Sequence, residues 1–299
     1  MKALRSPALG FLMALPPVLL VVAFVGLPIV TAALFSLGRT DGLNQVIAMI
    51  GQNVHKPEAG QFFTIGAYQQ IFADVRFVPD LVLTLSVTAI VTLVVLLIAV
   101  SLGLLLKLRG GWLPNLLTGL SVVPLFIPVV IAAWAILMFY AQDGFVRSFL
   151  SLFGINGPTW GYTSVSIVLG NIWTSLPFAV LMVGSGFQSI PDSMIEAAKD
   201  SGASLIAVIR RILIPMAGVP ITIATTFTAI GVLGSFTVAY FTGPNTPQML
   251  GVELNNFFVG FNQPQQAQVL AFVIFFFASA IAATYVWANF RTAKDSGRV

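Results

Sequence analysis

The chain has 299 residues, of which 58% are hydrophobic and only 8% are charged. Soluble globular proteins carry about a quarter charged residues, so this composition predicts a polytopic membrane protein. The chain has no cysteine and one histidine, which excludes a disulfide framework, thiolate chemistry and a histidine metal cluster. The formal net charge is +4, but the basic residues are scattered, which does not favour nucleic-acid binding.

Long uncharged runs divide the chain into six predicted membrane-spanning helices, because about 20 apolar residues cross a bilayer core. We expect these spans at 10–36, 81–106, 115–140, 165–187, 214–240 and 267–290. The first follows Lys2 and Arg5, but its uncharged run from Ser6 to Gly38 is too long for a signal peptide. We therefore interpret residues 1–299 as a single all-α transmembrane domain.

The stretch 37–80, after the first span, is the largest loop expected outside the membrane. It mixes polar and apolar residues, as in FFTIGAYQQIFADVRF. Two structures remain open for it. One is a short amphipathic helix on the membrane surface, and the other is a packed connector between the first two spans.

The basic residues predict the orientation of the chain. If both termini are cytoplasmic, the inner side holds ten basic residues and the outer side holds four, as the positive-inside rule requires. The inner residues are Lys2, Arg5, Lys107, Arg109, Lys199, Arg210, Arg211, Arg291, Lys294 and Arg298. The outer residues are Arg39, Lys56, Arg76 and Arg147. The loop 188–213, between the fourth and fifth spans, is then cytoplasmic.

This cytoplasmic loop and the start of the next span contain EAAKDSGASLIAVIRRILIP, residues 196–215, a polar stretch for such a hydrophobic chain. Ser193 and Glu196 have the spacing of a capping box at a helix start. Gly202 permits a left-handed or close-packed turn, and a second short helix is expected to bury Leu205, Val208, Ile209 and Ile212. The residues alone fit two structures equally: a knob that inserts into a partner's groove, or an interfacial hairpin without a partner.

The spacing E-A-A-x3-G-x9-I-x-[LI]-P resembles the signature of membrane subunits of ATP-binding-cassette (ABC) importers that depend on a substrate-binding protein. The matching residues are Glu196, Ala197, Ala198, Gly202, Ile212, Ile214 and Pro215. Ile214 stands where the family often has leucine. The resemblance extends from about Leu81 to the C-terminus. It implies the transmembrane domain of a type I ABC importer, in a bacterial inner membrane.

The resemblance further implies that residues 191–201 form a coupling helix that docks on a cytoplasmic ATP-binding subunit. The docking residues would be Glu196, Ala197, Ala198, Lys199, Asp200, Gly202 and Pro215. The sequence has no G-x-x-x-x-G-K-[ST] phosphate loop, so the chain is expected to be non-catalytic. ATP and magnesium are expected on the partner, itself a dimer, and no cofactor or metal on this chain. The other expected partners are a second permease subunit in a heterodimer, a periplasmic or extracellular solute-binding protein, and membrane lipid.

The translocation path is expected to contain polar or aromatic side chains. Trp173, Tyr240 and Phe241 are candidates to line it, although such aromatics are also common at the lipid interface. Asp80 and Glu253 are candidate contacts for a positively charged solute. For Glu253, a simple charge on an outside loop remains the competing interpretation.

The stretch GSFTVAYFTGPNTPQMLG at 234–251 looks more like polyamine-type permeases than sugar-type ones. Sugar-type permeases usually carry T-x-G-G-P where this chain has only Thr242, Gly243 and Pro244. A spermidine or putrescine importer is therefore predicted. The first alternative is the same importer class for an aminophosphonate, iron or a sugar. The second is an ion-coupled secondary transporter, although the inverted repeats and intramembrane ionisable relays of that class are not evident.

Overall fold

The computed structural model describes residues 7–295, with side chains from Phe11 to Trp287. The described residues form helices and loops and contain no strand, which confirms the all-α fold. The chain divides into two compact units. Unit 1 contains the chain up to Phe77 together with Glu253–Val273. Unit 2 contains Val78–Val252 and the chain from Ile274 onward.

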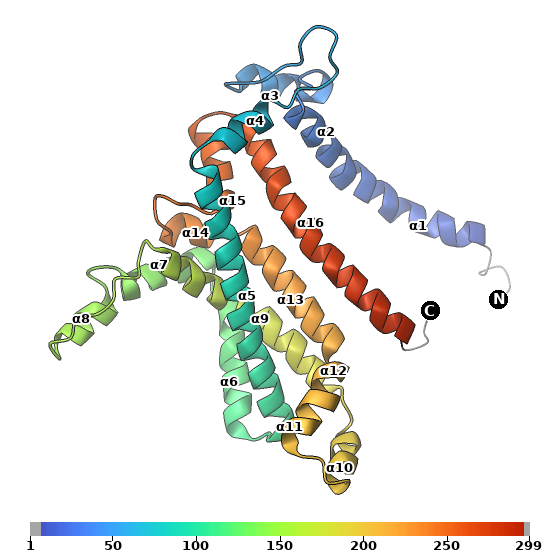
Figure 1. Cartoon of the computed structure of the whole chain (residues 1–299), viewed down its shortest axis with the longest axis vertical. Helices are drawn as coiled ribbons and strands as arrows, with labels where there is room; N and C mark the ends of the chain where they lie inside the picture. The colour runs from blue at the N-terminus through green and yellow to red at the C-terminus, as the bar shows by residue number, and fades with distance from the viewer. Residues whose placement is uncertain (1–6, 296–299) are drawn as a thin grey trace. The chain divides into compact units, whose positions relative to one another are not determined.

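Unit 1 consists of an N-terminal helix, a connector of short helices and the start of the C-terminal helix (Figure 1). Its elements are α1 (Pro7–Val21), the π-helical η2 (Val22–Gly26), α2 (Leu27–Ser36), η3 (Gly42–Asn44), α3 (Gln45–Ile50), α4 (Gly66–Ala73), η6 (Asn256–Gly260) and the first part of α16 (Pro264–Asp295). α1, η2 and α2 follow one another without a break, so the predicted first span is one helical run.

Two fully buried glutamines at the start of α16 hold the connector of unit 1 in place. Gln265 Nε2 donates to the carbonyl oxygens of Phe35 at 2.9 Å and His55 at 3.0 Å, and its Oε1 accepts from His55 N at 2.7 Å. Gln266 Nε2 donates to the carbonyl oxygen of Asn53 at 2.8 Å. These hydrogen bonds satisfy loop backbone groups that burial would otherwise leave without partners.

The stretch 37–80 therefore combines features of both structures left open for it. α4 is packed, with Ala67 and Ile71 fully buried. α3 instead exposes Val46, Met49 and Ile50, as a helix on an apolar surface does.

Unit 2 is a bundle around one central helix. Its elements are α5 (Phe77–Leu108), α6 (Trp112–Val122), η4 (Val123–Phe126), α7 (Val129–Tyr140), α8 (Phe145–Ser151), α9 (Ser164–Gln188), α10 (Asp192–Asp200), α11 (Leu205–Val208), the π-helical η5 (Ile209–Leu213), α12 (Ile214–Met216), α13 (Gly218–Leu233), α14 (Thr237–Thr242), the first half of α15 (Leu250–Asn255) and the part of α16 from Ile274 onward. α9 packs against α6, α7, α13 and α14. α10, α11 and α12 lie at one end of unit 2, and α7, α8 and α14 lie toward the other (Figure 1).

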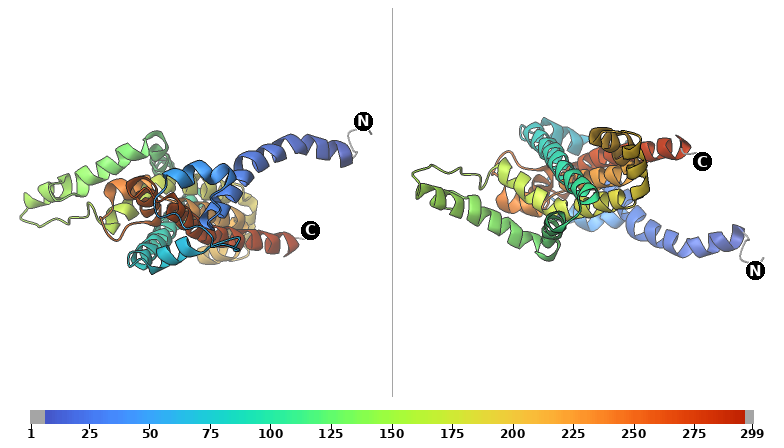
Figure 2. Two further views of the ribbon diagram at one scale, coloured as in Figure 1. Left: turned by 90° about the horizontal axis from the view of Figure 1, so that it is seen from above. Right: turned by 90° about the horizontal axis from the view of Figure 1, so that it is seen from below.

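Small and β-branched side chains form the core of unit 2. α5 contributes Val87, Val91, Val95 and Ala99, and α9 contributes residues such as Ala179, Val180 and Val183. Such side chains allow helix backbones to approach closely, which is how helices associate in lipid. α8 and the loop that follows it extend away from this bundle (Figure 2).

The predicted third span, 115–140, is interrupted in the structure. α6 and η4 end at Phe126, Ile127 and Pro128 are extended, and α7 begins at Val129. Proline cannot donate a helical hydrogen bond and disfavours helix at the residue before it, so the Ile127–Pro128 pair breaks the ladder.

The predicted fifth span, 214–240, is also divided. The helical run Leu205–Met216 meets the helix Gly218–Leu233 at an angle of 67°, with Ala217 between them. α13 then ends before Gly234, and α14 is a separate short helix.

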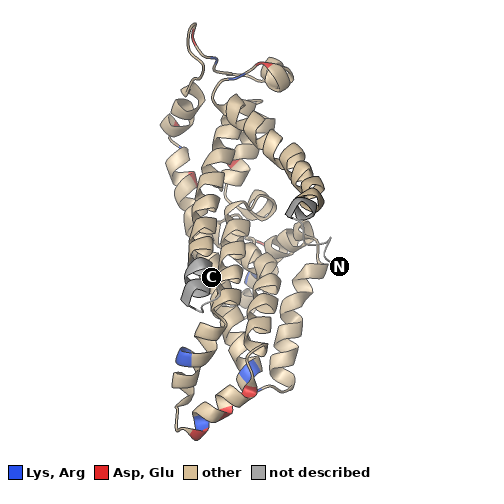
Figure 3. Ribbon diagram, turned by 90° about the vertical axis from the view of Figure 1, so that its right-hand side faces the viewer, with Lys and Arg blue, Asp and Glu red and all other residues tan. Residues whose placement is uncertain are grey.

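Five described helices are long and apolar enough to cross a membrane, or six if the bent pair counts as one span. They are Phe11–Ser36, Phe77–Leu108, Val129–Ser151, Ser164–Gln188 and Pro264–Trp287, with Leu205–Met216 and Gly218–Leu233 as the bent pair. In Figure 3, charged residues gather at the end of unit 2 that contains α10 and η5. Lys2, Arg5 and Arg298, used to predict the orientation, lie outside the described residues.

Candidate functional site

The predicted docking helix is α10, and it begins earlier than its capping-box pattern indicates. Pro191 is the N-cap residue, with φ −62° and ψ 135°, and no side chain caps the helix start. The capping box expected from Ser193 and Glu196 is therefore not formed. Proline suits a helix start because it has no N–H to satisfy, and Asp192 in the first turn interacts favourably with the helix dipole.

Most of the predicted docking side chains are exposed on α10. Its buried residue is Ile195, and Ala198 is half-buried. Glu196, Ala197, Lys199 and Asp200 are exposed. A short helix with one buried anchor and an exposed mixed-charge face can offer that face to another protein.

Gly202 ends the docking helix in a left-handed turn. Its φ is +77°, a conformation that side chains other than glycine rarely adopt. Gly202 N donates to the carbonyl oxygen of Lys199 at 2.9 Å, and Ala203 N donates to that of Ala198 at 2.9 Å. These bonds satisfy carbonyl groups at the helix C-terminus. A β-carbon on Gly202 would meet no atom within 4 Å, so the backbone conformation, and not space, requires glycine.

The helical run after the turn anchors the segment to unit 2. Val208 and Leu213 are fully buried, whereas Pro215 is exposed within α12. The predicted burial of Val208 is confirmed, but that of Leu205 is wrong: Leu205 is 54% exposed and its neighbour Ile206 is 75% exposed. Leu205 begins α11 directly after the exposed turn, so both side chains add apolar surface beside the charged face of α10.

A second candidate site lies at the middle of α9, where it packs against α13. Ser175, Phe178, Phe227 and Thr228 line a cavity of about 180 Å³. The Phe178 and Phe227 rings have their centroids 5.6 Å apart. Thr228 is 3% exposed, and its hydroxyl oxygen has no hydrogen-bond partner among the described residues. Buried hydroxyl groups are usually paired, so an unpaired one in a residue that lines a cavity marks this place as a candidate site.

The unpaired hydroxyl of Thr228 differs from other hydroxyls on the same helix. Thr222 and Thr225 donate to the carbonyl oxygens of Gly218 and Ile221, one turn earlier, at 2.8 and 2.7 Å. None of the four residues that line this cavity was among the predicted site residues. The i, i+3 spacing of Ser175 and Phe178 places a hydroxyl and a ring on one helix face, and that signal could have identified half of the site.

The three predicted path aromatics do not form one lining. Trp173 contributes to a largely apolar cavity of about 520 Å³ between α7 and α9. Tyr240 and Phe241 lie in α14, where their ring centroids are 5.4 Å apart. Tyr240 also stacks on Phe236 at 5.1 Å. That Trp173, Tyr240 and Phe241 contact the solute remains a prediction.

Asp80 is buried at the start of α5, where it holds the loop that precedes α15. Its Oδ1 accepts from Gln248 N at 2.7 Å. Thr84 Oγ1 accepts from Leu250 N at 2.9 Å and donates to the carbonyl oxygen of Asp80 at 2.7 Å. Asp80 is 2% exposed, so its carboxylate has a structural task within unit 2.

Glu253 is buried in unit 1 with a basic partner. Its Oε1 lies 3.0 Å from Arg76 Nη1, and its Oε2 accepts from Asn256 Nδ2 at 3.0 Å. The Arg76 guanidinium also lies over the rings of Phe257 and Phe261, at 5.8 and 5.7 Å. The carboxylate is thus neutralised inside the protein, unlike a simple charge on an outside loop.

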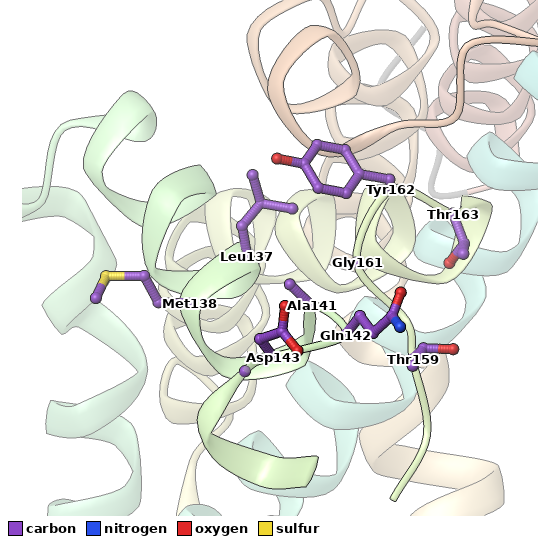
Figure 4. Close-up of a pocket in the computed structure, with 10 residues that line it drawn as sticks. Leu137, Met138, Ala141, Gln142, Asp143, Thr159, Gly161, Tyr162 and Thr163 are labelled. Atoms are coloured by element: carbon purple, nitrogen blue, oxygen red, sulfur yellow. The ribbon is translucent and has the colours of Figure 1, made fainter. Parts of the chain in front are cut away.

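A further cavity, of about 590 Å³, lies beside the start of α9 (Figure 4). Its lining comes from the end of α7 and from the loops on either side of α8, and includes Gln142, Asp143, Thr159, Tyr162 and Thr163. The 25 residues of α9 span roughly 37 Å, about the thickness of a bilayer. This one helix therefore passes from the cavity beside its start, past the central cavity, to the end of unit 2 that contains α10.

Comparisons with known proteins identify the transport class. A trehalose/maltose transport system permease protein, MalF, of Thermococcus litoralis is 26% identical over 244 residues, which is 79% of this chain and 77% of the relative. A spermidine/putrescine transport system permease protein, PotB, of Escherichia coli is 26% identical over 156 residues, or 52% and 56% of the two chains. The predicted polyamine subgroup is therefore not supported, because the sugar permease matches more of this chain.

A solved structure supports the type I importer fold. The crystal structure of a bacterial alginate ABC transporter, in complex with an alginate pentasaccharide-bound periplasmic protein, contains a chain that is 16% identical to this one. The match has a TM-score of 0.73 and covers 95% of this chain and 94% of that chain.

The family described as binding-protein-dependent transport system inner membrane component matches residues 98–291. This range includes α9, the docking segment and α13, so the family assignment rests on the elements that build both candidate sites. The chain belongs to this family and is a non-catalytic permease subunit of an ABC importer.

Proposed function

We propose that this permease subunit forms the translocation path for a carbohydrate. The observation that carries the proposal is the central cavity, where Phe178 and Phe227 supply ring faces and Ser175 and Thr228 supply hydroxyl groups. Sugars present apolar C–H faces that stack on aromatic rings and hydroxyl groups that exchange hydrogen bonds. A neutral solute also needs no opposite charge, and the residues that line this cavity are uncharged.

The similar proteins also support a carbohydrate as the solute. The trehalose/maltose permease matches 79% of this chain, and the structural match comes from an alginate transporter. Both of those proteins are named for a saccharide. The two names differ in the saccharide, so the feature that they share is the carbohydrate class.

A polyamine is the second candidate, and it rests on the 234–251 pattern and on the PotB similarity. A dication would require carboxylates that are free to meet it. Glu253 already pairs with Arg76, and Asp80 already accepts from the backbone of Gln248. These contacts favour the carbohydrate.

The exposed face of α10 and the apolar side chains of Leu205 and Ile206 are proposed to dock on a cytoplasmic ATP-binding subunit. ATP and magnesium would bind to that subunit. A soluble binding protein would deliver the solute from the other side, and a second permease subunit in a heterodimer would complete the path. With α10 in the cytoplasm, both termini are cytoplasmic and the chain crosses a bacterial inner membrane.

The docked subunit would drive transport by alternating access. Nucleotide-dependent closure of the partner would favour one of two arrangements of the membrane helices, so that the central cavity opens to one side at a time.

The test is uptake by the complete transporter, reconstituted with its binding protein and ATP-binding subunit. Labelled trehalose, maltose and spermidine are offered separately at equal concentrations. ATP-dependent accumulation of a sugar supports the proposal. Accumulation of spermidine alone overturns the carbohydrate assignment, and accumulation without ATP in an ion gradient overturns the importer mechanism for this chain.

Thr228→Val tests the cavity directly, because valine has nearly the same shape but no hydroxyl. Loss of one hydrogen bond to a neutral group costs about 1 kcal/mol, so uptake at low sugar concentration is expected to fall about five- to tenfold. Thr225→Val on the same helix is the matched control, because its hydroxyl is already paired with Ile221. Equal uptake by both variants would remove Thr228 from the site.

A further inference from the structure

A buried lysine links α5 to the docking helix of unit 2. Lys107 lies in the last turn of α5, and its side chain is only 5% exposed. Lysine is almost never buried unless its ammonium group is paired. Lys107 Nζ donates to the carbonyl oxygen of Ile190 at 2.7 Å and lies 2.6 Å from Asp192 Oδ1.

The two partners of Lys107 flank the N-cap residue of α10. Ile190 precedes Pro191 and Asp192 follows it, so one ammonium group holds both sides of the helix start. Ile190 is buried, and its carbonyl group needs a donor there. The Asp192 side chain is 75% exposed, so solvent weakens its attraction to the Lys107 ammonium group. The hydrogen bond from Lys107 to the Ile190 carbonyl oxygen is the contact that is protected from solvent.

The surrounding packing makes this link stiff. One turn before Lys107, a β-carbon on Gly103 would lie 2.6 Å from Cδ2 of Phe187, so α5 and α9 are in direct contact here. Phe187 is fully buried, and Ile190 and Ile195 are nearly so. A displacement of α10 therefore cannot be absorbed by an empty space beside Lys107.

The same α5 helix is fastened again near its other end. Asp80 and Thr84 hold the backbone of residues 248–250. The 28 residues from Asp80 to Lys107 form a helical rod of roughly 40 Å. The contacts of Lys107 and those of Asp80 and Thr84 all lie in unit 2, so α5 connects α10 with the loop before α15.

We propose that Lys107 is a positioning residue that transmits the movement of the docking helix to α5. This inference rests on the proposed docking of α10 on an ATP-binding subunit. Without the link, α10 would still be attached to α9 through the chain and could still bind its partner. The movement of the partner would then bend the joint at Ile190 and Pro191 instead of shifting α5.

The experiment measures solute transported per ATP hydrolysed in the reconstituted transporter. Lys107→Met keeps the aliphatic stem and removes the charge and the donor. We expect it to retain the ATP-binding subunit and hydrolyse ATP, while the transport ratio falls at least about fivefold, the lower range of coupling between sites. Lys107→Arg is expected to restore the ratio, because a guanidinium can reach both acceptors.

Arg109→Met is the matched control. Arg109 lies two residues after Lys107 and its side chain is exposed. This variant also removes a positive charge, but the amount of solute transported per ATP should stay unchanged. A purely structural role for Lys107 would lower the yield of the complex but leave transport per ATP of the assembled fraction unaltered. That result would overturn the inference.

Two other outcomes are also decisive. If Lys107→Met does not assemble, Lys107→Gln replaces it, because its neutral amide keeps a polar group in the buried position but is too short to make both contacts of the lysine. A lower transport ratio supports the inference, and an unchanged ratio overturns it. If the wild-type chain does not retain an ATP-binding subunit, the proposed docking fails, and this result is distinct from a failure of Lys107 alone.

Discussion

The docking segment and the Arg76–Glu253 pair use charged residues in opposite ways. On α10, Glu196, Lys199 and Asp200 are exposed. In unit 1, Glu253 is buried and pairs with Arg76, which in turn lies over two phenylalanine rings. In a chain with 8% charged residues, these two regions thus show two arrangements of charge: an exposed mixed-charge face and a buried carboxylate with a counter-charge.

This difference predicts how substitutions should act. A change to an exposed charge on α10 leaves the permease stable but alters what it binds. A change to a buried charge in unit 1 lowers stability because it leaves its partner without a counter-charge. Transport and stability are therefore expected to separate between the two regions.

The largest effect is expected from Glu196→Lys, which should abolish uptake while the protein remains inserted in the membrane. Reversal of an exposed charge costs the fold little, but a charge of the wrong sign in a docking face disfavours the partner. Co-purification of the ATP-binding subunit, uptake and membrane level are measured together. Glu58→Lys, at an exposed position in the loop between α3 and α4, is the matched control charge reversal. Normal uptake by Glu196→Lys would count heavily against docking through α10.

Gly202→Asp is expected to reduce uptake severely, because it adds a negative charge beside the proposed docking face at a turn that also requires φ near +77°. Asparagine tolerates this conformation better than most residues, so Gly202→Asn should retain more uptake than Gly202→Ala. The order glycine, asparagine, alanine is the expected ranking in an uptake assay. Equal uptake by the Asn and Ala variants would show that the left-handed turn is not required.

Arg76→Met should lower stability by about 2 kcal/mol, because it leaves the buried Glu253 carboxylate without its cation. This loss of stability is smaller than the loss expected when a fully buried ion pair is broken, because the Arg76 side chain is 41% exposed. Arg39→Met removes a pair with Asp41 that is exposed on both sides, so a loss of about 0–1 kcal/mol is expected. Melting of the purified complex compares the two. Equal shifts would refute the distinction between the pairs.

Glu253→Gln sharpens the same comparison. It removes the buried charge itself, so its stability loss should be smaller than that of Arg76→Met. In the carbohydrate importer proposed here, it should also leave sugar uptake per molecule unchanged. Loss of spermidine uptake in this variant and in Asp80→Asn would instead restore the acidic path predicted from sequence.

The smallest effect concerns pH. A side-chain hydrogen bond from Arg76 holds the pKa of Asp74 below its ordinary value. A lowered folded-state pKa adds stability that is present above the ordinary carboxyl pKa of about 3.9 and is lost as pH falls through the folded value. The melting difference between wild type and Asp74→Asn should therefore be constant from pH 7 to 5 and shrink toward pH 3. A difference that grows on acidification would contradict this assignment.

Much of the fold was predictable because lipid imposes strong rules on sequence. Runs without charge identified the apolar helices, since a spanning helix must be long and hydrophobic. The docking segment was recognisable because its residues are local in the chain, and Gly202 occupies the left-handed turn expected of it. The positions of the breaks were less predictable. Ile127 and Pro128 divide one expected helix. The 67° bend lies at Ala217, inside the stretch that was predicted as one continuous fifth span.

Taken alone, the sequence determined the class of this protein, a membrane-embedded, all-helical permease, and predicted a docking helix in it. These properties depend on composition and on residues that are near neighbours in the chain. Only the tertiary structure decided which polar groups are free. Asp80 and Glu253 meet partners from distant segments, whereas the Thr228 hydroxyl lines a cavity and has no partner among the described residues. Such pairings join helices far apart in sequence, so no local pattern could predict them.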